Sequence, residues 1–171
     1  MEYTRAGASV ALPDGWLYAL LYRDGTQRED VLAGLSRFPE EIRFANGTAF
    51  LGYGLAETVS PGGTLEVWVA WWVRSLPPAG VEYHFFAHLM DEEDVLRSQC
   101  DVAGFPTASW RAGDLVLSRF PIPIHSDLPT GSYHVVAGQY TYPDVANVSF
   151  LDAAGNPAGD RLTLGEVSVT R

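Results

Sequence analysis

The chain contains no lysine: all eleven basic residues among its 171 are arginine. Without lysine, a P-loop nucleotide site and the Schiff-base chemistry of pyridoxal enzymes are excluded. Acidic residues outnumber basic ones by 21 to 11, which gives a formal net charge of −10. Because a negative field of this size repels phosphate backbones and anionic lipid surfaces, we expect no nucleic-acid partner.

Cysteine and long apolar runs are also scarce. The single cysteine, Cys100, excludes an internal disulfide and any zinc site built from several cysteines. No apolar run approaches the roughly 18 residues of a transmembrane helix, and the first residues, MEYTRAGASV, lack the pattern of a secretion signal. We therefore expect a cytoplasmic protein or, if the chain is a piece of a longer membrane protein, an extracytoplasmic one in the cell envelope.

Apolar and aromatic residues, by contrast, are plentiful. Hydrophobic residues make up 47% of the chain and aromatic residues 12%, which is too much for a disordered protein. A length of 171 residues suits one domain with its own core. We predict a single domain over residues 1–171, with a strand and helix extension over 1–45 and the main core over 46–171.

From Gly47 onward, apolar and polar residues alternate in short runs separated by turn residues, a pattern typical of a sandwich or barrel. In the clearest run, Thr64 to Val73, the odd-numbered residues from Leu65 are apolar and share one face, because side chains alternate along a strand. Val81 to Met90 repeats this pattern. We therefore predict an all-β fold, an antiparallel β-sandwich of immunoglobulin-like or jelly-roll-like type. Further strands are predicted over residues 95–102, 114–124, 132–142, 147–151 and 161–170.

The first 45 residues have a different pattern. The segment from Trp16 to Tyr22 is suited to a strand. Thr26 and Glu29 have the spacing of a capping box, and the apolar residues that follow share one helical face. We predict a short helix that ends before Pro39. The pair Asn46–Gly47 that follows is typical of a hairpin turn.

The two central runs suggest a binding face. The acidic stretch Asp91 to Asp94 is interpreted as a four-residue hairpin loop, which would place Arg97 opposite His88 and Asp101 opposite His84. If the run 64–73 is the neighbouring strand, its outward tryptophans join this face. Aromatic rings beside amide, carboxylate and guanidinium groups suit a sugar, which offers an apolar C–H face and hydroxyls. The predicted ligand-binding residues are Trp68, Trp72, His84, His88, Arg97, Gln99 and Asp101.

Other interpretations of these residues remain open. The N-terminal segment or another domain could cover the face, and its tryptophans would then be ordinary core. A hydrolase built on His84 and Asp101 would need a serine nucleophile, and the chain has no G-x-S-x-G motif. On a strand, His84 and His88 lie roughly 13 Å apart at about 3.3 Å per residue, too far to share a metal ion. We therefore predict no catalytic residue, no metal site and no cofactor.

An ordered series of motifs extends from Phe50 to Val169: FLGYGL, PGGTLEVWVAWW, YHFFAHLMD, QCD, FPTASWRAGD, DLPTGSYHVVAGQY and LTLGEVSV. This series resembles the soluble C-terminal β-sandwich region of bacterial membrane glycosyltransferases similar to the polyprenyl-phosphate-sugar-dependent mannosyltransferases. The resemblance implies an extracytoplasmic appendage that meets acceptor glycans or the membrane-embedded domain of its parent protein. It implies no catalytic residue on this chain, because the catalytic machinery of such enzymes is in their membrane portion.

We therefore predict a non-catalytic accessory or carbohydrate-binding module, part of or related to a membrane glycosyltransferase and not itself an enzyme. Its expected partners are a glycan and the membrane-embedded domain. The alternative is a structural protein–protein interaction domain whose aromatic face packs on another domain or on a second copy. A wet, grooved face would favour a ligand, and a flat apolar patch of several hundred Å² would favour a protein.

Overall fold

The computed structural model describes the backbone of residues 2–5, 8–11 and 18–21, and all of residues 32–171. Within these residues the regular structure is almost entirely β-strand, with one short 3-10 turn, η1 (Thr107–Ser109), and two helical residues, Leu32 and Ala33. The strands are β1 (Glu2–Arg5), β2 (Ala8–Ala11), β3 (Tyr18–Leu21), β4 (Ile42–Phe44), β5 (Thr48–Leu55), β6 (Thr58–Val59), β7 (Thr64–Val73), β8 (Glu82–Met90), β9 (Leu96–Val102), β10 (Leu115–Pro123), β11 (Gly131–Tyr142), β12 (Phe150–Leu151), β13 (Pro157–Gly159) and β14 (Arg161–Val169).

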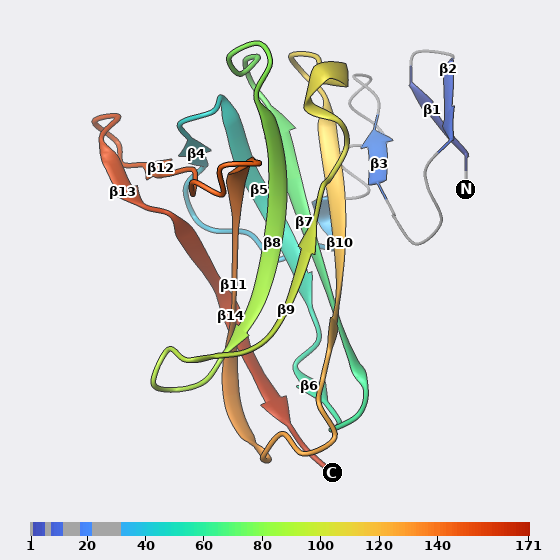
Figure 1. Ribbon diagram of the computed structural model, residues 1–171, viewed down its shortest axis with the longest axis vertical. Coiled ribbons are helices and arrows are strands. Elements are labelled where there is room, and N and C mark those ends of the chain that lie inside the picture. Colours follow the sequence, from blue (N-terminus) through green and yellow to red (C-terminus); the bar gives the residue numbers. More distant parts are fainter. Residues whose placement is uncertain (1, 6–7, 12–17, 22–31) are drawn as a thin grey trace.

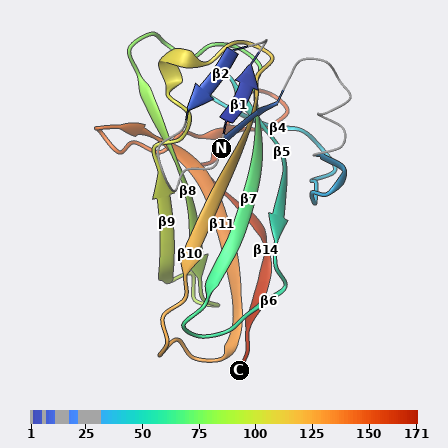
Figure 2. The same ribbon diagram turned by 90° about the vertical axis from the view of Figure 1, so that its right-hand side faces the viewer.

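Most of these strands form two large sheets, whose long strands run along the long axis of the molecule (Figure 1). The order of the seven-stranded sheet is β13-β12-β4-β5-β7-β10-β3, and that of the five-stranded sheet is β6-β14-β11-β8-β9. Figure 2 shows β7 and β10 in one layer, with β11 and β14 behind them. Neighbouring strands are antiparallel except for β6 and β14, which are parallel. The predicted all-β fold is therefore confirmed.

The hydrophobic core lies between the two sheets, as side-chain alternation along the strands predicts. Odd-numbered residues of β7 and β8 belong to one buried apolar cluster: Leu65, Val67, Val69, Trp71, Val73, Tyr83, Phe85, Ala87 and Leu89. Both predicted alternations are confirmed. Because the odd-numbered residues of both strands point inward, the even-numbered residues of β7 and β8 lie on opposite outer surfaces of the molecule.

The predicted strand boundaries agree closely with the observed ones. The run 64–73 coincides with β7, and the run 132–142 differs from β11 by one residue. The run 147–151 is longer than the strand it contains, since only Phe150–Leu151 is strand and Asn147 forms an isolated bridge with Tyr140. Asn46 and Gly47 lie in the predicted turn between β4 and β5, where Gly47 has a φ of 85° that favours glycine.

Part of the N-terminal segment contributes to the seven-stranded sheet. β3 lies within the predicted strand 16–22 and pairs with β10 at one edge of the sheet, and β4 pairs with β5. The sheet therefore includes residues from the segment predicted as an extension. The predicted helix is not confirmed, because residues 26–31 lie outside the described residues and, of residues 32–38, only Leu32 and Ala33 are helical. Ser36, near its predicted end, forms an isolated bridge with Tyr53.

Three buried polar side chains connect the two sheets. Asn46 Nδ2 donates to Gln139 Oε1 at 2.7 Å, and Gln139 Nε2 donates to Thr48 Oγ1 at 2.8 Å. Thr48 Oγ1 in turn donates to Asn46 Oδ1 at 2.9 Å, which closes the ring and offsets the cost of burying these groups. Because Asn46 lies in the β4–β5 turn, Thr48 begins β5 and Gln139 is on β11, the ring of hydrogen bonds fixes β11 against the opposite sheet.

Candidate functional site

The predicted binding face does not exist as one surface. Trp68 and Trp72 are on β7 of the seven-stranded sheet, whereas His84, His88 and the residues of β9 are on the five-stranded sheet. The prediction that β7 neighbours β8 is wrong, because β7 pairs with β5 and β10, and β8 pairs with β9 and β11. The connection from β7 to β8 crosses between the sheets instead of closing a hairpin. The even-numbered residues therefore belong to two faces with different chemistry.

The tryptophan face is the outer surface of the seven-stranded sheet around Trp68 and Trp72. The guanidinium carbon of Arg119 lies 6.0 Å from the centre of the Trp68 ring, and that of Arg74 lies 4.8 Å from the centre of the Trp72 ring. Arg119 Nε donates to Glu66 at 2.7 Å, and Arg74 donates to Glu41. Each arginine is thus held near a tryptophan ring by a cation–π contact and by a carboxylate, and a ligand that stacks on that ring would have to displace it.

Leucines of the segment before β4 also cover this face. Leu32, Ala70 and Leu115 form a buried apolar cluster, against which Leu35, Leu51 and Leu117 pack. Ala70 is the even-numbered residue of β7 between the two tryptophans, so its burial shows that the N-terminal segment covers this part of the sheet. The alternative interpretation, in which the N-terminal segment covers the outer surface of β7, is confirmed at Ala70.

On the five-stranded sheet, the predicted pairing of β8 with β9 is shifted by two residues. His88 lies opposite Gln99 and Phe86 lies opposite Asp101, whereas the prediction placed Arg97 opposite His88 and Asp101 opposite His84. The connection is longer than the predicted four-residue loop, and the register shifts again between Leu89 and Met90. Because a shift of two residues keeps the parity of a strand, His84, His88, Gln99 and Asp101 still share one face.

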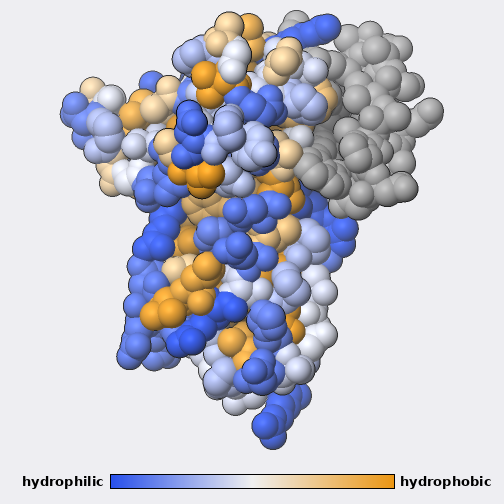
Figure 3. Space-filling model, in the orientation of Figure 1, coloured by the Kyte–Doolittle hydropathy of each residue, from blue (hydrophilic) through white to orange (hydrophobic). Residues whose placement is uncertain are grey.

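We call this surface the histidine face and define it by the outward residues His84, Phe86, His88, Gln99, Asp101, Tyr140 and Tyr142. Its floor is Phe86, which is 4% exposed and clusters with Met90 and Val136. The Phe86 ring lies over Gly138 of β11, where an added Cβ would come within 2.5 Å of the ring. A glycine at this cross-strand position therefore leaves room for the end of the ring beside the neighbouring strand. In Figure 3, hydrophobic residues on the visible side of the molecule are interrupted by hydrophilic ones.

Polar groups surround this apolar floor. His88 Nε2 donates to Asp101 Oδ1 at 2.8 Å, and the His88 ring packs on Phe86 with a centroid distance of 4.5 Å. The Tyr140 hydroxyl lies 3.5 Å from His84 Nδ1. On its other side, His84 stacks nearly parallel to Tyr142, with ring centroids 4.4 Å apart. Tyr142 is 54% exposed, so this stack presents an aromatic surface to the solvent.

Burial and neighbouring charges shift the pKa values of two of these groups. Burial lowers the pKa of His84, an effect opposed by the negative charges of Glu82 and Asp101. Burial raises the pKa of Tyr140, and the charge of Asp101 adds to the increase. At neutral pH, Tyr140 therefore keeps its hydroxyl proton, and His84 is predominantly neutral.

Arg97, predicted to bind ligand, instead stabilises the β8–β9 hairpin. Its Nε donates to Asp91 Oδ2 at 2.7 Å. The Asp91 carboxylate also accepts hydrogen bonds from the backbone N–H groups of Val95 and Glu93, and these bonds, that of Val95 foremost, together with Arg97 lower its pKa. The guanidinium and the carboxylate thus hold the loop closed.

Tyr140 and Tyr142 were missed by the sequence analysis, although the run 132–142 was predicted correctly. They alternate with the buried Gln139 along β11 and pair with His84 and Glu82 of β8. Their outward direction could have been read from the parity of this run. The pairing of β11 with β8 could not have been read from the sequence, because 40 residues, which include β9 and β10, separate the two strands.

The hydrolase interpretation required His84 to pair with Asp101, and this pairing is wrong. The cross-strand partner of His84 is Tyr140, and Asp101 accepts a hydrogen bond from His88.

Among the residues described, no group of three or more His, Cys, Asp or Glu side chains could hold a metal ion. None of the helical segments in the described part of the chain is long and apolar enough to cross a bilayer.

Comparisons with known proteins reveal little similarity. No protein-family model matches the chain, and no curated protein matches it. A solved structure from work described as "AvmM Catalyzes Macrocyclization in Alchivemycin A Biosynthesis" is similar to this chain, with 10% sequence identity and a TM-score of 0.45. The match covers 80% of this chain and 95% of that one. At this TM-score, neither the fold nor the function of the present chain is inferred from it.

Proposed function

We propose that this chain is a non-catalytic carbohydrate-binding module whose site is the histidine face. The observation that carries the proposal is the exposed Tyr142 ring, stacked on His84 and next to groups that can bond hydroxyls. A sugar needs an apolar platform for its C–H face and polar groups around its rim. Tyr142 supplies the platform, and His84, His88, Gln99, Asp101 and Tyr140 supply the rim.

The charge states of the rim suit a neutral ligand. Tyr140 keeps its proton and donates it to Asp101, a bond that a sugar hydroxyl can replace, and Asp101, also bonded to His88, has further acceptor positions for a sugar hydroxyl. The exposed Gln99 amide offers both a donor and an acceptor. Because a neutral sugar carries no charge, the net charge of −10 does not oppose its binding.

The wider context is also part of this proposal. The module would be a sandwich of immunoglobulin-like or jelly-roll-like type that acts outside the cytoplasm, beside the membrane-embedded part of a glycosyltransferase. The support is the ordered series of motifs from Phe50 to Val169. In this arrangement the module would bring acceptor glycans to a catalytic centre that another part of the protein supplies.

A second candidate function is protein–protein interaction, and two exposed side chains favour it. Tyr142 is 54% exposed and Val145 is 64% exposed, and both lie at the end of the molecule where β11 ends. Apolar side chains at a loop-rich end can contact a neighbouring domain or a second copy. Self-association in sedimentation, lost on Val145→Ser, would support this candidate.

A glycan-array screen of the whole chain, followed by calorimetric titration of the glycans that bind, tests the carbohydrate proposal. Tyr142→Ala should weaken binding about tenfold, which corresponds to the loss of one aromatic stacking contact. Gln99→Ala should weaken it about fivefold through lost hydrogen bonds. Trp68→Ala is the matched control and should leave the affinity unchanged. Binding that survives both Tyr142→Ala and Gln99→Ala but fails in Trp68→Ala would refute the assignment.

A further inference from the structure

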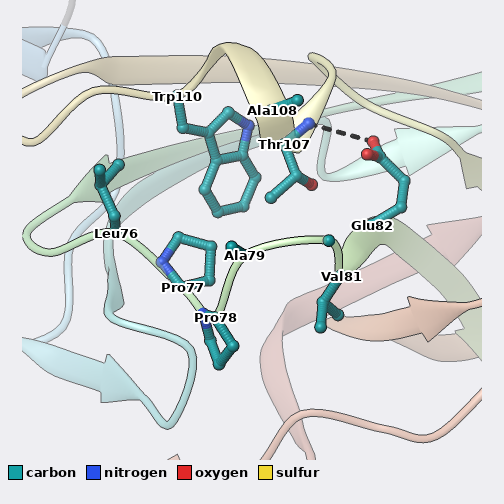
Figure 4. A pocket seen from close by; sticks show the side chains of 10 residues that line it. Leu76, Pro77, Pro78, Ala79, Val81, Glu82, Thr107, Ala108 and Trp110 are labelled. Carbon is teal, nitrogen blue, oxygen red and sulfur yellow. Dashed lines mark hydrogen bonds between the residues drawn. The ribbon is translucent and has the colours of Figure 1, made fainter.

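A pocket of about 420 Å³ opens at the end of the molecule between the β7–β8 loop and η1 (Figure 4). The loop supplies Leu76, Pro77, Pro78, Ala79 and Val81. The opposite side is formed by Thr107, Ala108 and Trp110, and Glu82 lines the pocket at the start of β8. Its volume lies within the range of small-molecule sites, about 300 to 1,000 Å³.

The walls of this pocket are apolar and already in place. The rings of Pro77 and Pro78 restrict the backbone of the loop, and the Trp110 indole is fixed because its Nε1 donates to the Phe105 carbonyl at 2.9 Å. Leu76, at the rim, is 60% exposed. A ligand that covers Leu76 would remove this apolar side chain from water without reordering the loop, which favours binding.

Glu82 is the charged residue among those that line the pocket, and its carboxylate is turned toward Thr107 at the edge. The Thr107 N–H donates to Glu82 Oε1 at 3.1 Å, and Thr107 Oγ1 accepts from the Tyr83 N–H at 2.9 Å. The bond to Thr107 fixes the Glu82 carboxylate at the edge of the pocket, as Figure 4 shows. A carboxylate has about four acceptor positions, so Glu82 can accept further hydrogen bonds from a ligand.

We propose that this pocket binds a small cationic amine with an apolar body, which places its ammonium group on Glu82 and its body between Leu76, the two prolines and Trp110. An ammonium group forms a charge-assisted hydrogen bond with the carboxylate. The carboxylate and the net charge of −10 repel a small anion of the same shape. A neutral ligand would bury the same apolar surface without an ionic partner.

The pocket is separate from the histidine face, because no residue of that face lines it. Glu82 nevertheless lies opposite Tyr142 across β8 and β11, and its charge raises the pKa of His84. A bound ammonium group that neutralises Glu82 should therefore lower the pKa of His84. An apolar molecule held without contact to Glu82 would not have this effect.

The test is an NMR titration of the whole chain at pH 7 with three nearly isosteric probes: 2-phenylethylammonium, 2-phenylethanol and phenylacetate. The ammonium probe should bind about fivefold more tightly than the alcohol, the ratio expected for an ion pair at a partly exposed carboxylate. Phenylacetate should bind most weakly. Glu82→Gln, which keeps an oxygen to accept from Thr107 N–H, should remove the difference between the ammonium probe and the alcohol. Leu76→Ser should weaken both.

Three outcomes would overturn the proposal. Equal affinity for the ammonium probe and the alcohol in the unsubstituted chain would show that Glu82 takes no part. Unchanged affinities in Leu76→Ser, whose exposed side chain can be replaced without disturbing the core, would place the probe elsewhere. Weaker binding of the ammonium probe in Tyr142→Ala would assign it to the histidine face.

Discussion

The two outer faces of the molecule carry aromatic side chains for the same reason and use them differently. On both β7 and β8, alternation places aromatic residues outward: Trp68 and Trp72 on one sheet, His84 and Phe86 on the other. On the tryptophan face, Arg119 and Arg74 lie over the rings. On the histidine face, the neighbouring strand supplies Gly138, against which the buried Phe86 packs, and Tyr142, whose ring is 54% exposed.

The residue opposite on the neighbouring strand decides what packs against Trp68 and against Phe86. Trp68 lies opposite Arg119 of β10, so its ring receives a guanidinium group. Phe86 lies opposite Gly138 of β11, where the absence of a Cβ leaves room for its ring.

Phe86→Ala should have the largest effect on stability. The ring is 4% exposed although it points away from the main core, and its removal leaves a cavity between β8 and β11. We expect a loss of about 3 kcal/mol in the free energy of unfolding, typical of a buried phenylalanine. Urea denaturation measures it. A loss below about 1 kcal/mol would show that the ring is not the floor described here.

Gly138→Ala should destabilise the same floor from the opposite strand. The added methyl group would overlap the Phe86 ring and approach the Asp160 carbonyl oxygen to 2.8 Å. We expect a cost of about 2 kcal/mol from overpacking. Combining Gly138→Ala with Phe86→Leu should recover part of that stability. If the two effects are simply additive, the ring and the glycine do not share one space.

Trp68→Ala should cost less, about 1 kcal/mol, because it removes a cation–π contact on a partly exposed surface. Arg119→Ala should have a similar effect, and the double variant should cost less than the sum of the two. Thermal denaturation of the three variants measures this coupling. A cost for Trp68→Ala as large as that for Phe86→Ala would mean that the two faces do not differ as described.

The smallest effect is on the pH dependence of stability. Burial lowers the pKa of His84 below its value of 6.5 in the unfolded chain, so the unfolded state takes up the proton first as the pH falls. The contribution of neutral His84 to the free energy of unfolding is fully present above pH 6.5. It is lost as the pH falls from 6.5 through the lowered pKa of the folded state. His84→Gln should therefore flatten the decrease in the urea midpoint below pH 6.5. An unchanged decrease would contradict the shift.

Local patterns predicted the strands and which side chains point inward, because alternation depends on a few neighbouring residues. β7 was predicted over Thr64–Val73 as observed, and the odd-numbered residues from Leu65, predicted to share one apolar face, are buried together. Sheet assignment depends on contacts distant in sequence. The placement of Trp68 beside His84 failed because the β7–β8 connection crosses between the sheets, a choice that the loop residues do not specify.

The candidate site was predicted in part for the same reason. His84, His88, Gln99 and Asp101 lie on strands joined by one hairpin, where parity survives a register shift of two residues. Tyr140 and Tyr142 join them only through the pairing of β11 with β8. Arg97 was assigned to the ligand because a hairpin loop that binds its own arginine through Asp91 is not visible in residue spacing.

The most direct test of the account is to map by NMR which residues change chemical shift when a glycan identified on the array is added. We predict the largest changes at Gln99, Asp101, Tyr140 and Tyr142, with the indole signals of Trp68 and Trp72 unchanged. Changes centred on Trp68 and Trp72, with the histidine face unaffected, would contradict the assignment of the binding site to the five-stranded sheet.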